Sequence, residues 1–336
     1  MTLKVVCYGV RHNEVPYFEK LNKYHYELSL VSDLLTHDNI ETAKGMDAVI
    51  LRGNCVGDRQ NIEKMAEYGV KYLFTRTVGF NHIDLEAAAD YNMLVARVPG
   101  YSPNAVAELS LTLGMMLLRH TAHTTARTSQ KNFIVDDTMF SKEVRNCTVG
   151  LIGTGRIGLT EAKLYKGLGA KVVGYDVFQS DAAKEVVTFV TLDELLATCD
   201  IVSLHVPYLP GRNEKMIDAD FLSKMKDGAI LVNTARGELQ DNEAILAALE
   251  SKKLDGFGTD VFANEATIFF KDFGVNGEIP DATVQKLVNL YPRVLVTPHI
   301  GSNTDEAVTN MIEISFDNLN DVLTTGQTAN AVTEQK

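Results

Sequence analysis

The chain has 336 residues, of which 45% are hydrophobic, and its formal net charge is −12. That length is enough for two domains with separate cores. The acidic balance, without a run of Lys or Arg, argues against a nucleic-acid or anionic membrane partner, and no apolar stretch is long enough to span a bilayer.

Four cysteines are scattered along the chain without CxxC spacing, and three of them lie in or beside apolar runs. We expect buried, reduced thiols and therefore a cytoplasmic protein. The first ten residues contain a short apolar run without a small-residue cleavage site, which predicts a strand and not a signal peptide. The histidines show no metal-ligand spacing, so we expect no metal ion.

Short apolar runs alternate with helical patterns, which is typical of parallel α/β sheets. In the first hundred residues the predicted strands are Lys4–Tyr8, Tyr26–Leu30, Ala48–Leu51, Tyr72–Phe74 and Leu94–Ala96. One long helix is predicted from Pro103 to about residue 130. A second series of strands follows at Val149–Ile152, Val172–Tyr175, Ile201–His205, Ile230–Val232, Gly256–Thr259 and Val294–Val296.

Two segments near the end of the chain stand apart from this alternation. Residues 264–293 look like a long irregular insertion, a length that is usually functional or particular to a subfamily. A last helix is predicted from Thr304 to about Thr324, after the cap residues Ser302 and Asn303. Its apolar positions would suit packing against the first module.

Residues 147–176 carry the most informative pattern in the chain. An apolar run ends in a GxGxxG sequence, a helical pattern follows, and a second apolar run closes on Asp176. Gly153 suits a tight turn, Gly155 allows a pyrophosphate to approach the backbone, and Gly158 allows close helix–strand packing. The carboxylate of Asp176 would accept the ribose hydroxyls and repel a 2′-phosphate, so NAD is favoured over NADP.

Ligands of open parallel sheets bind beyond the carboxyl ends of the strands, so we consider the residues that follow each strand. Alone, each of these would be a surface charge, a packing residue or a cap; their common placement beside a nucleotide fingerprint favours a site. These residues are Arg52, Arg76, Val78, Gly79, Phe80, Tyr101, Pro207, Asn233, Thr234, Ala235, Arg236, Asp260, Pro298 and His299.

The chemistry of a 2-oxo acid would give several of these side chains a role. Arg236 can bind a carboxylate through two parallel hydrogen bonds, and His299 can give a proton to a carbonyl oxygen. Glu265 behind His299 would keep the imidazole charged. Backbone N–H groups at Val78 and Gly79 could hold the substrate carboxylate.

Along nearly its whole length, the chain resembles the D-isomer-specific 2-hydroxyacid dehydrogenases. The motifs that carry the resemblance are YSPNAVAE (101–108), VGLIGTGRIG (149–158), CDIVSLHVP (199–207), MKDGAILVNTARGEL (225–239), GTDVF (258–262) and VLVTPHIGS (294–302). The resemblance implies that Arg236 orients substrate, that His299 is the acid/base with Glu265 as its partner, and that Asp260 binds the nicotinamide amide.

The resemblance also implies the architecture and the cofactor. We expect two Rossmann-like, doubly wound parallel-sheet α/β domains with a deep interdomain cleft. Residues 1–101 plus 300–336 would form a discontinuous substrate domain and residues 102–299 the NAD-binding domain, which in this family usually forms a homodimer. We assign to cofactor binding Gly153, Gly155, Arg156, Ile157, Gly158, Asp176, Val206, Pro207, Asn213, Thr234, Ala235 and Asp260, and to substrate binding Arg52, Val78, Gly79 and Tyr101.

The long segment 264–293 resembles the D-lactate dehydrogenase branch. Within it, ILRGNC (50–55), MFSKEVRNCTVG (139–150) and LYPRVLVTPHIGS (290–302) resemble (R)-2-hydroxyglutarate dehydrogenases most. Arg52 at a strand end would suit the second carboxylate of 2-oxoglutarate. The alternative is a D-lactate or D-2-hydroxyisocaproate type enzyme with a broad 2-oxo acid range, in which Arg52 has another role.

An alternative function of another class is that of a nucleotide-sensing binding protein, like the transcriptional co-repressors of this family. The lack of extended disordered tails argues against this alternative. A bulky Phe80 beside the expected carboxylate site could also narrow the pocket or favour an apolar substrate side chain.

Overall fold

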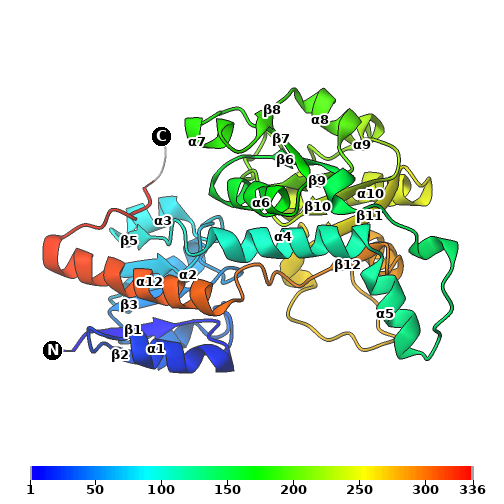
Figure 1. Cartoon of the computed structure of the whole chain (residues 1–336). Coiled ribbons are helices and arrows are strands. Elements are labelled where there is room, and N and C mark those ends of the chain that lie inside the picture. The colour runs from blue at the N-terminus through cyan, green and yellow to red at the C-terminus, as the bar shows by residue number, and fades with distance from the viewer. Residues whose placement is uncertain (1, 334–336) are drawn as a thin grey trace. The chain divides into compact units, whose positions relative to one another are not determined.

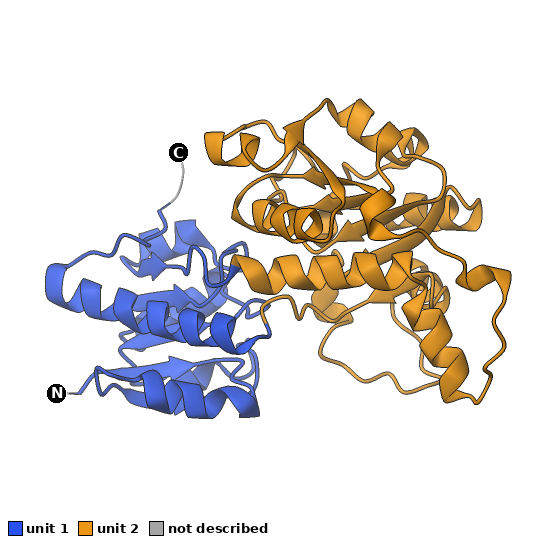
Figure 2. Cartoon of the chain, viewed as in Figure 1, with its two compact units in different colours: residues 1–102, 303–336 blue, residues 103–302 orange. Residues whose placement is uncertain are grey.

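The computed structural model describes residues 2–333, which form two compact units. Unit 1 comprises residues 2–102 and 303–333, and unit 2 comprises residues 103–302 (Figure 2). The sequence-based boundaries differ from these by one residue at the first junction and by three at the second. Residues 1 and 334–336, which the predicted substrate domain includes, lie outside the described residues.

Unit 1 contains a five-stranded parallel sheet in the order β2-β1-β3-β4-β5 (Figure 1). Its strands are β1 (Lys4–Cys7), β2 (Glu27–Leu30), β3 (Ala48–Leu51), β4 (Tyr72–Thr75) and β5 (Leu94–Ala96). Its helices are η1 (His12–Glu14), α1 (Val15–Leu21), η2 (Ile40–Ala43), α2 (Arg59–Glu67), α3 (Leu85–Asp90) and α12 (Asp305–Thr325).

Helices cover both faces of this sheet because successive strand residues point to opposite faces. On one face, Ile62 and Met65 of α2 pack with Val49 and Leu73 of the strands. On the other face α1 meets α12, where the rings of Phe18 and Phe316 lie 6.1 Å apart. The last helix therefore returns to the first module, as its apolar positions predict.

Unit 2 contains a seven-stranded parallel sheet in the order β12-β11-β10-β9-β6-β7-β8. Its strands are β6 (Thr148–Ile152), β7 (Lys171–Tyr175), β8 (Thr188–Phe189), β9 (Ile201–Leu204), β10 (Ala229–Asn233), β11 (Leu254–Thr259) and β12 (Val294–Val296). Its helices are α4 (Pro103–Leu118), α5 (Thr121–Ser129), η3 (Asp137–Met139), η4 (Val144–Asn146), α6 (Arg156–Gly167), α7 (Asp181–Lys184), α8 (Leu192–Thr198), α9 (Ala219–Lys224), η5 (Gly237–Leu239), α10 (Asn242–Glu250), η6 (Glu265–Thr267) and α11 (Ala282–Asn289).

The sheet order of unit 2 reverses direction between β6 and β9, which is the doubly wound arrangement of dinucleotide-binding domains. Helices α4 and α6 cover one face, and α8 to α11 cover the other (Figure 1). The prediction of two parallel α/β sheets is therefore confirmed. Among the described residues, no helix has both the length and the apolar character needed to cross a bilayer.

Three details of the sequence-based description are wrong. The single helix predicted from Pro103 is two helices, because His120 adopts a left-handed backbone with φ of 47° between α4 and α5. The segment 264–293 is not wholly irregular, since α11 begins after Asp281, whose carboxylate caps its first turn. Thr304, and not Ser302 or Asn303, is the N-cap of α12. The four cysteines are free and buried, as expected.

Candidate active site

The GxGxxG sequence lies between β6 and α6, at the point where the sheet order of unit 2 reverses. Gly153 has a φ of +94°, and a Cβ on it would lie 2.6 Å from the carbonyl oxygen of His205. A Cβ on Gly158 would lie 2.0 Å from the carbonyl oxygen of Gly153. A Cβ on Gly155 would meet no heavy atom within 4 Å, so the backbone there is open to a ligand.

Arg156 and Ile157 open α6, whose first N–H groups and positive dipole end suit a pyrophosphate. Asp176 follows β7, and its Oδ2 accepts a 2.6 Å hydrogen bond from the Thr154 N–H. Its Oδ1 accepts from the Phe178 N–H at 3.0 Å. These bonds fix the carboxylate beside the fingerprint loop, at the position that the sequence predicts for ribose recognition.

A buried acid–histidine pair lies beneath this loop, and the sequence reasoning did not single it out. Glu161 on α6 is 0% exposed, and its Oε2 lies 2.5 Å from Nε2 of His205, which follows β9. The carbonyl oxygen of His205 packs against Gly153. The pair therefore ties the phosphate-facing helix to the strand end that carries Val206 and Pro207.

The remaining cofactor candidates follow β9 and β10. Asn213 donates to the Pro207 carbonyl at 2.8 Å and accepts from the Leu209 N–H at 2.7 Å, so it braces the loop after β9. Thr234 is 7% exposed, and its hydroxyl lies 2.6 Å from that of Ser110. The Ala235 N–H donates to Oδ1 of Asn233 at 3.0 Å, which shapes the turn that leads to Arg236.

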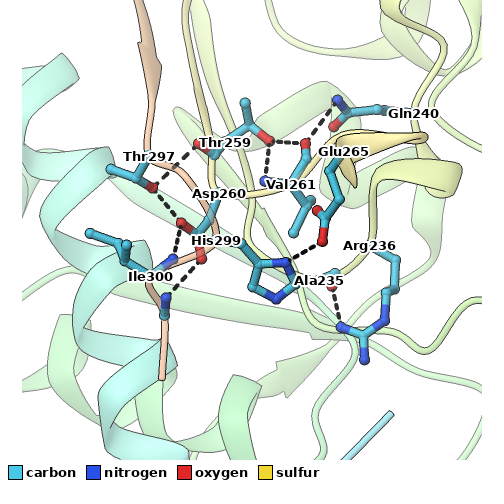
Figure 3. Close-up of polar contacts among 11 residues, drawn as sticks. Ala235, Arg236, Gln240, Thr259, Asp260, Val261, Glu265, Thr297, His299 and Ile300 are labelled. Carbon is cyan, nitrogen blue, oxygen red and sulfur yellow. Dashed lines mark hydrogen bonds and ion pairs between the residues drawn. The ribbon is translucent and has the colours of Figure 1, made fainter. Parts of the chain in front are cut away.

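His299 occupies a turn after β12 that is held by a buried carboxylate (Figure 3). Its φ of +52° is a left-handed conformation that a non-glycine residue adopts only when its surroundings impose it. The next two N–H groups, of Ile300 and Gly301, each donate to Asp260 at 2.8 Å. The hydroxyl of Thr297 donates to the same carboxylate at 2.6 Å.

Asp260 is 2% exposed, and burial raises its pKa, while the bonds from Thr297 and Ile300 oppose that shift. Both of its oxygens therefore hold the turn that presents His299. Contact of Asp260 with the nicotinamide amide, which the sequence resemblance implies, stays a prediction; the structure shows its bonds to the turn that contains the histidine.

Glu265 contacts His299 within unit 2, and Arg236 is drawn on the same side of the ring (Figure 3). Oε1 of Glu265 lies 2.7 Å from Nδ1 of His299, which leaves Nε2 as the ring nitrogen that can meet a substrate. Nη1 of Arg236 donates to its neighbour Ala235 at 2.6 Å, which orients the half-buried guanidinium. The structure thus brings together the acid, the imidazole and the cation that the sequence predicts.

Comparisons with known proteins agree with this geometry. The NAD binding domain of the D-isomer specific 2-hydroxyacid dehydrogenases matches residues 111–301. The chain is 39% identical over 319 residues to an aromatic 2-oxoacid reductase of Clostridium sporogenes, which covers 94% of this chain and 95% of that protein. The chain belongs to the D-isomer specific 2-hydroxyacid dehydrogenases.

Two further relatives extend the likeness across both units. A D-lactate dehydrogenase of Lactiplantibacillus plantarum is 40% identical over 330 residues, which covers 97% of this chain and 98% of that protein. The solved structure of a D-2-hydroxyisocaproate dehydrogenase matches with a TM-score of 0.88 and 35% identity, over 99% of this chain and 100% of that one. These relatives place the chain in the D-lactate dehydrogenase branch.

The protein is therefore an NAD-dependent oxidoreductase that acts on the CH–OH group of D-2-hydroxy acids. The residues present fit NAD: the backbone at Gly155 is open to phosphates, and Asp176 lies where the ribose hydroxyls would be read. Bound NADH supplies a hydride to the carbonyl carbon of a 2-oxo acid.

The four substrate candidates belong to unit 1. Arg52 follows β3, Val78 and Gly79 follow β4, and Tyr101 precedes the end of the unit, where its carbonyl oxygen accepts from Asn310 of α12 at 2.6 Å. Because the sheet order of unit 1 reverses between β1 and β3, Arg52 lies at the switch point of that sheet.

Proposed function

We propose that His299 gives the proton to the carbonyl oxygen of a 2-oxo acid during reduction and takes it back during oxidation. The 2.7 Å contact between Glu265 and Nδ1 of His299 supports this proposal, because it orients the ring and leaves Nε2 for the substrate. The hydride reaches the carbonyl carbon, the proton reaches its oxygen, and the product is the (R)-2-hydroxy acid.

We further propose that Arg236 binds the carboxylate common to all 2-oxo acids, together with the N–H groups of Val78 and Gly79. The guanidinium of Arg236 is planar and is oriented by its bond to Ala235, so it suits a carboxylate that lies in one plane. Within unit 2, Arg236 follows β10 and His299 follows β12, at the carboxyl ends of two parallel strands that only β11 separates, which supports their acting on one substrate.

For the substrate class, the relatives favour a broad 2-oxo acid range over strict use of 2-oxoglutarate. The similar proteins are described as an aromatic 2-oxoacid reductase, a D-lactate dehydrogenase and a D-2-hydroxyisocaproate dehydrogenase. We therefore propose reduction of several 2-oxo acids, and keep 2-oxoglutarate as one of them on the basis of Arg52 and the three motifs that resemble (R)-2-hydroxyglutarate dehydrogenases.

The surroundings of Arg52 support a role in binding a distal carboxylate. It is half-buried near Arg11 and Arg76, and burial followed by these two cations lowers its pKa to about 10. The carboxylate of Glu14 also lies near these groups; it is 1% exposed and pairs with Arg76 at 3.1 Å. The mutual repulsion of the three guanidiniums at the switch point of unit 1 would be reduced by an anionic ligand.

A substrate panel tests these assignments. We would measure kcat/KM for pyruvate, 2-oxoisocaproate, phenylpyruvate and 2-oxoglutarate in the wild type, Arg52→Ala and Arg236→Lys. Arg236→Lys should raise KM for every acid, because it keeps the charge but loses the paired donors. Arg52→Ala should lower the preference for 2-oxoglutarate by about ten- to a hundredfold, the size of one charged hydrogen bond. An unchanged preference would remove 2-oxoglutarate recognition from Arg52 and leave the broad activity.

We also propose that the protein forms a homodimer through unit 2. The segment between α5 and β6 exposes four large apolar side chains, namely Phe133 (75%), Ile134 (69%), Val135 (82%) and Phe140 (87%). Such a patch on a water-facing surface usually marks an interface. Sedimentation of the double variant Phe133→Asp, Phe140→Asp should give monomers, whereas the control Val275→Asp, at another fully exposed apolar residue, should sediment as the wild type.

The free, buried thiols support the proposal that this protein works in the reducing cytoplasm. Cell fractionation would test it, and recovery of the activity in an exported fraction would contradict it.

A further inference from the structure

The loop between β4 and α3 carries the Val78 and Gly79 amides, yet it lies outside any helix or strand. Two donors from residues 97–98 hold its peptide planes. The Val98 N–H donates to the Thr77 carbonyl at 3.1 Å, and Nη1 of Arg97 donates to the Val78 carbonyl at 3.0 Å. Because the N–H of a trans peptide points opposite to its C=O, these bonds aim the Val78 and Gly79 N–H groups away from residues 97–98.

The other polar groups of the loop are also tied. The Thr77 hydroxyl donates to the Gly79 carbonyl at 2.7 Å and lies 2.6 Å from the Thr75 hydroxyl. Within residues 2–333, neither the Val78 nor the Gly79 N–H has an acceptor. The Thr77 and Val78 carbonyls of the same two peptides are already hydrogen-bonded, so the Val78 and Gly79 N–H groups remain as two donors for a ligand.

Arg97 is itself held from three sides. Its guanidinium carbon lies 5.4 Å from the centroid of the Phe80 ring, within the range of a cation–π contact. Its backbone N–H donates to the Asn330 carbonyl at 3.1 Å, and its carbonyl accepts from Asn318 of α12 at 3.0 Å. Asn318 is 2% exposed and also accepts from Thr328 at 2.9 Å, which helps to hold residues 328–332 against β5.

We propose that Arg97 and Phe80 form a clamp that orients the Val78–Gly79 amides toward the substrate carboxylate, so Arg97 is a positioning residue for every 2-oxo acid. This inference rests on the proposed binding of the carboxylate by those amides. In this proposal Phe80 supports the Arg97 guanidinium and does not select the side chain of the substrate.

The clamp acts on the part of the substrate that all 2-oxo acids share, so its loss changes affinity without changing preference. Arg97→Met removes both the donor and the cation, and should raise KM for all acids by a common factor of roughly ten, the effect of about 1.4 kcal/mol. Arg97→Lys keeps a cation over Phe80 and should recover part of the loss. Phe80→Leu should raise KM by a smaller common factor.

The experiment measures kcat and KM for pyruvate, 2-oxoisocaproate and 2-oxoglutarate in these variants. It also measures the Kd of oxamate, an unreactive isostere of pyruvate, on the enzyme–NADH complex by fluorescence, and the Kd of NADH itself. Arg59→Met, which removes an exposed arginine of α2 that pairs with Asp90, is the matched control. Far-UV circular dichroism and the urea midpoint confirm that each variant is folded.

The clamp is supported if KM and the oxamate Kd rise together in Arg97→Met while kcat, the NADH Kd and the ratios among the acids stay near wild type. It is overturned if Phe80→Leu shifts those ratios, because Phe80 would then contact the substrate side chain, or if folded Arg97→Met keeps the wild-type KM. Arg236→Lys distinguishes failure of the clamp from failure of the proposed carboxylate site. If it raises KM while Arg97→Met does not, only the clamp fails; if neither does, the proposed carboxylate site fails.

Discussion

His299 in unit 2 and the Val78–Gly79 amides in unit 1 are both oriented by hydrogen bonds from distant parts of the chain, but the supports differ. The turn of His299 is held by Asp260, a carboxylate that is 2% exposed and accepts three hydrogen bonds. The amides of unit 1 are held by the Val98 N–H and by the half-buried guanidinium of Arg97, which gives one hydrogen bond and lies 5.4 Å from the centroid of the Phe80 ring.

The difference affects how each site responds to substitution. Removing a buried acceptor leaves buried donors unsatisfied, which costs far more than the net value of one hydrogen bond. Water can replace part of a bond made by a half-buried arginine. The turn that presents His299 is therefore expected to tolerate substitution of its support less well than the Val78–Gly79 loop does.

The largest expected effect on the rate is that of removing the imidazole of His299. His299→Ala removes the proton donor, so kcat/KM for reduction should fall by roughly 10²–10⁴-fold. The Kd of NADH, measured by fluorescence, should change little because the side chain lies in the reaction site and not in the fingerprint. Retention of more than a tenth of the wild-type rate would mean that another group supplies the proton.

Asp260→Ala should combine a loss of rate with a loss of stability. Two backbone N–H groups and a hydroxyl lose their buried acceptor, which should lower the free energy of unfolding by roughly 2–5 kcal/mol. Urea denaturation and kcat are the measurements, with His299→Ala as a control that should lose rate and keep stability. If Asp260→Ala were as stable as the wild type, the buried carboxylate would not be what holds the histidine turn.

Glu265→Gln should have a smaller effect on the rate. The amide oxygen can still accept a hydrogen bond from Nδ1 of His299, but the negative charge that lies 2.7 Å from the ring is lost. The variant should therefore lower kcat for reduction by less than His299→Ala does, with the Kd of NADH unchanged. Steady-state kinetics check this, and a wild-type kcat would exclude Glu265 from the role.

The smallest effect is expected in unit 1, where Arg52 carries a charge that folding disfavours. Burial and two neighbouring cations lower its pKa below the usual value, to about 10, so the unfolded chain holds the proton more tightly than the folded one. Arg52→Leu should therefore be at least as stable as the wild type at pH 7, and the difference should shrink as the pH rises above about 10. The urea midpoints of both proteins at pH 7 and at a pH above about 10 test this prediction. A clear loss of stability of Arg52→Leu at pH 7 would indicate a structural role for Arg52.

Much of this architecture could be predicted from the sequence because its signals are local. The strands of both sheets follow apolar runs, and the glycines of the fingerprint mark a turn whose geometry excludes a Cβ at residues 153 and 158. The break at His120 carries no Gly or Pro, so nothing in the local sequence marks the end of α4. The two-residue strand β8 is too short to produce a periodic pattern.

The supports of the site could not be predicted because their partners are far apart in the sequence. Asp260 bonds to Ile300 and Gly301, which lie about forty residues later. Arg97 orients Val78, and Asn318 reaches back to Arg97 across more than two hundred residues. Sequence reasoning predicted groups that would meet substrate and cofactor, but the residues that orient those groups became evident only with the fold.

The return of α12 to unit 1 has a consequence for how the chain folds during synthesis. Residues 103–302 form a continuous unit that can complete its sheet as soon as it has left the ribosome. Residues 2–102 leave the rings of Phe18 and Tyr26 uncovered until Phe316 emerges, since both rings pack against it. The second unit should therefore be native first, and a stalled chain that ends before residue 303 should bind chaperones through the apolar face that α12 normally covers.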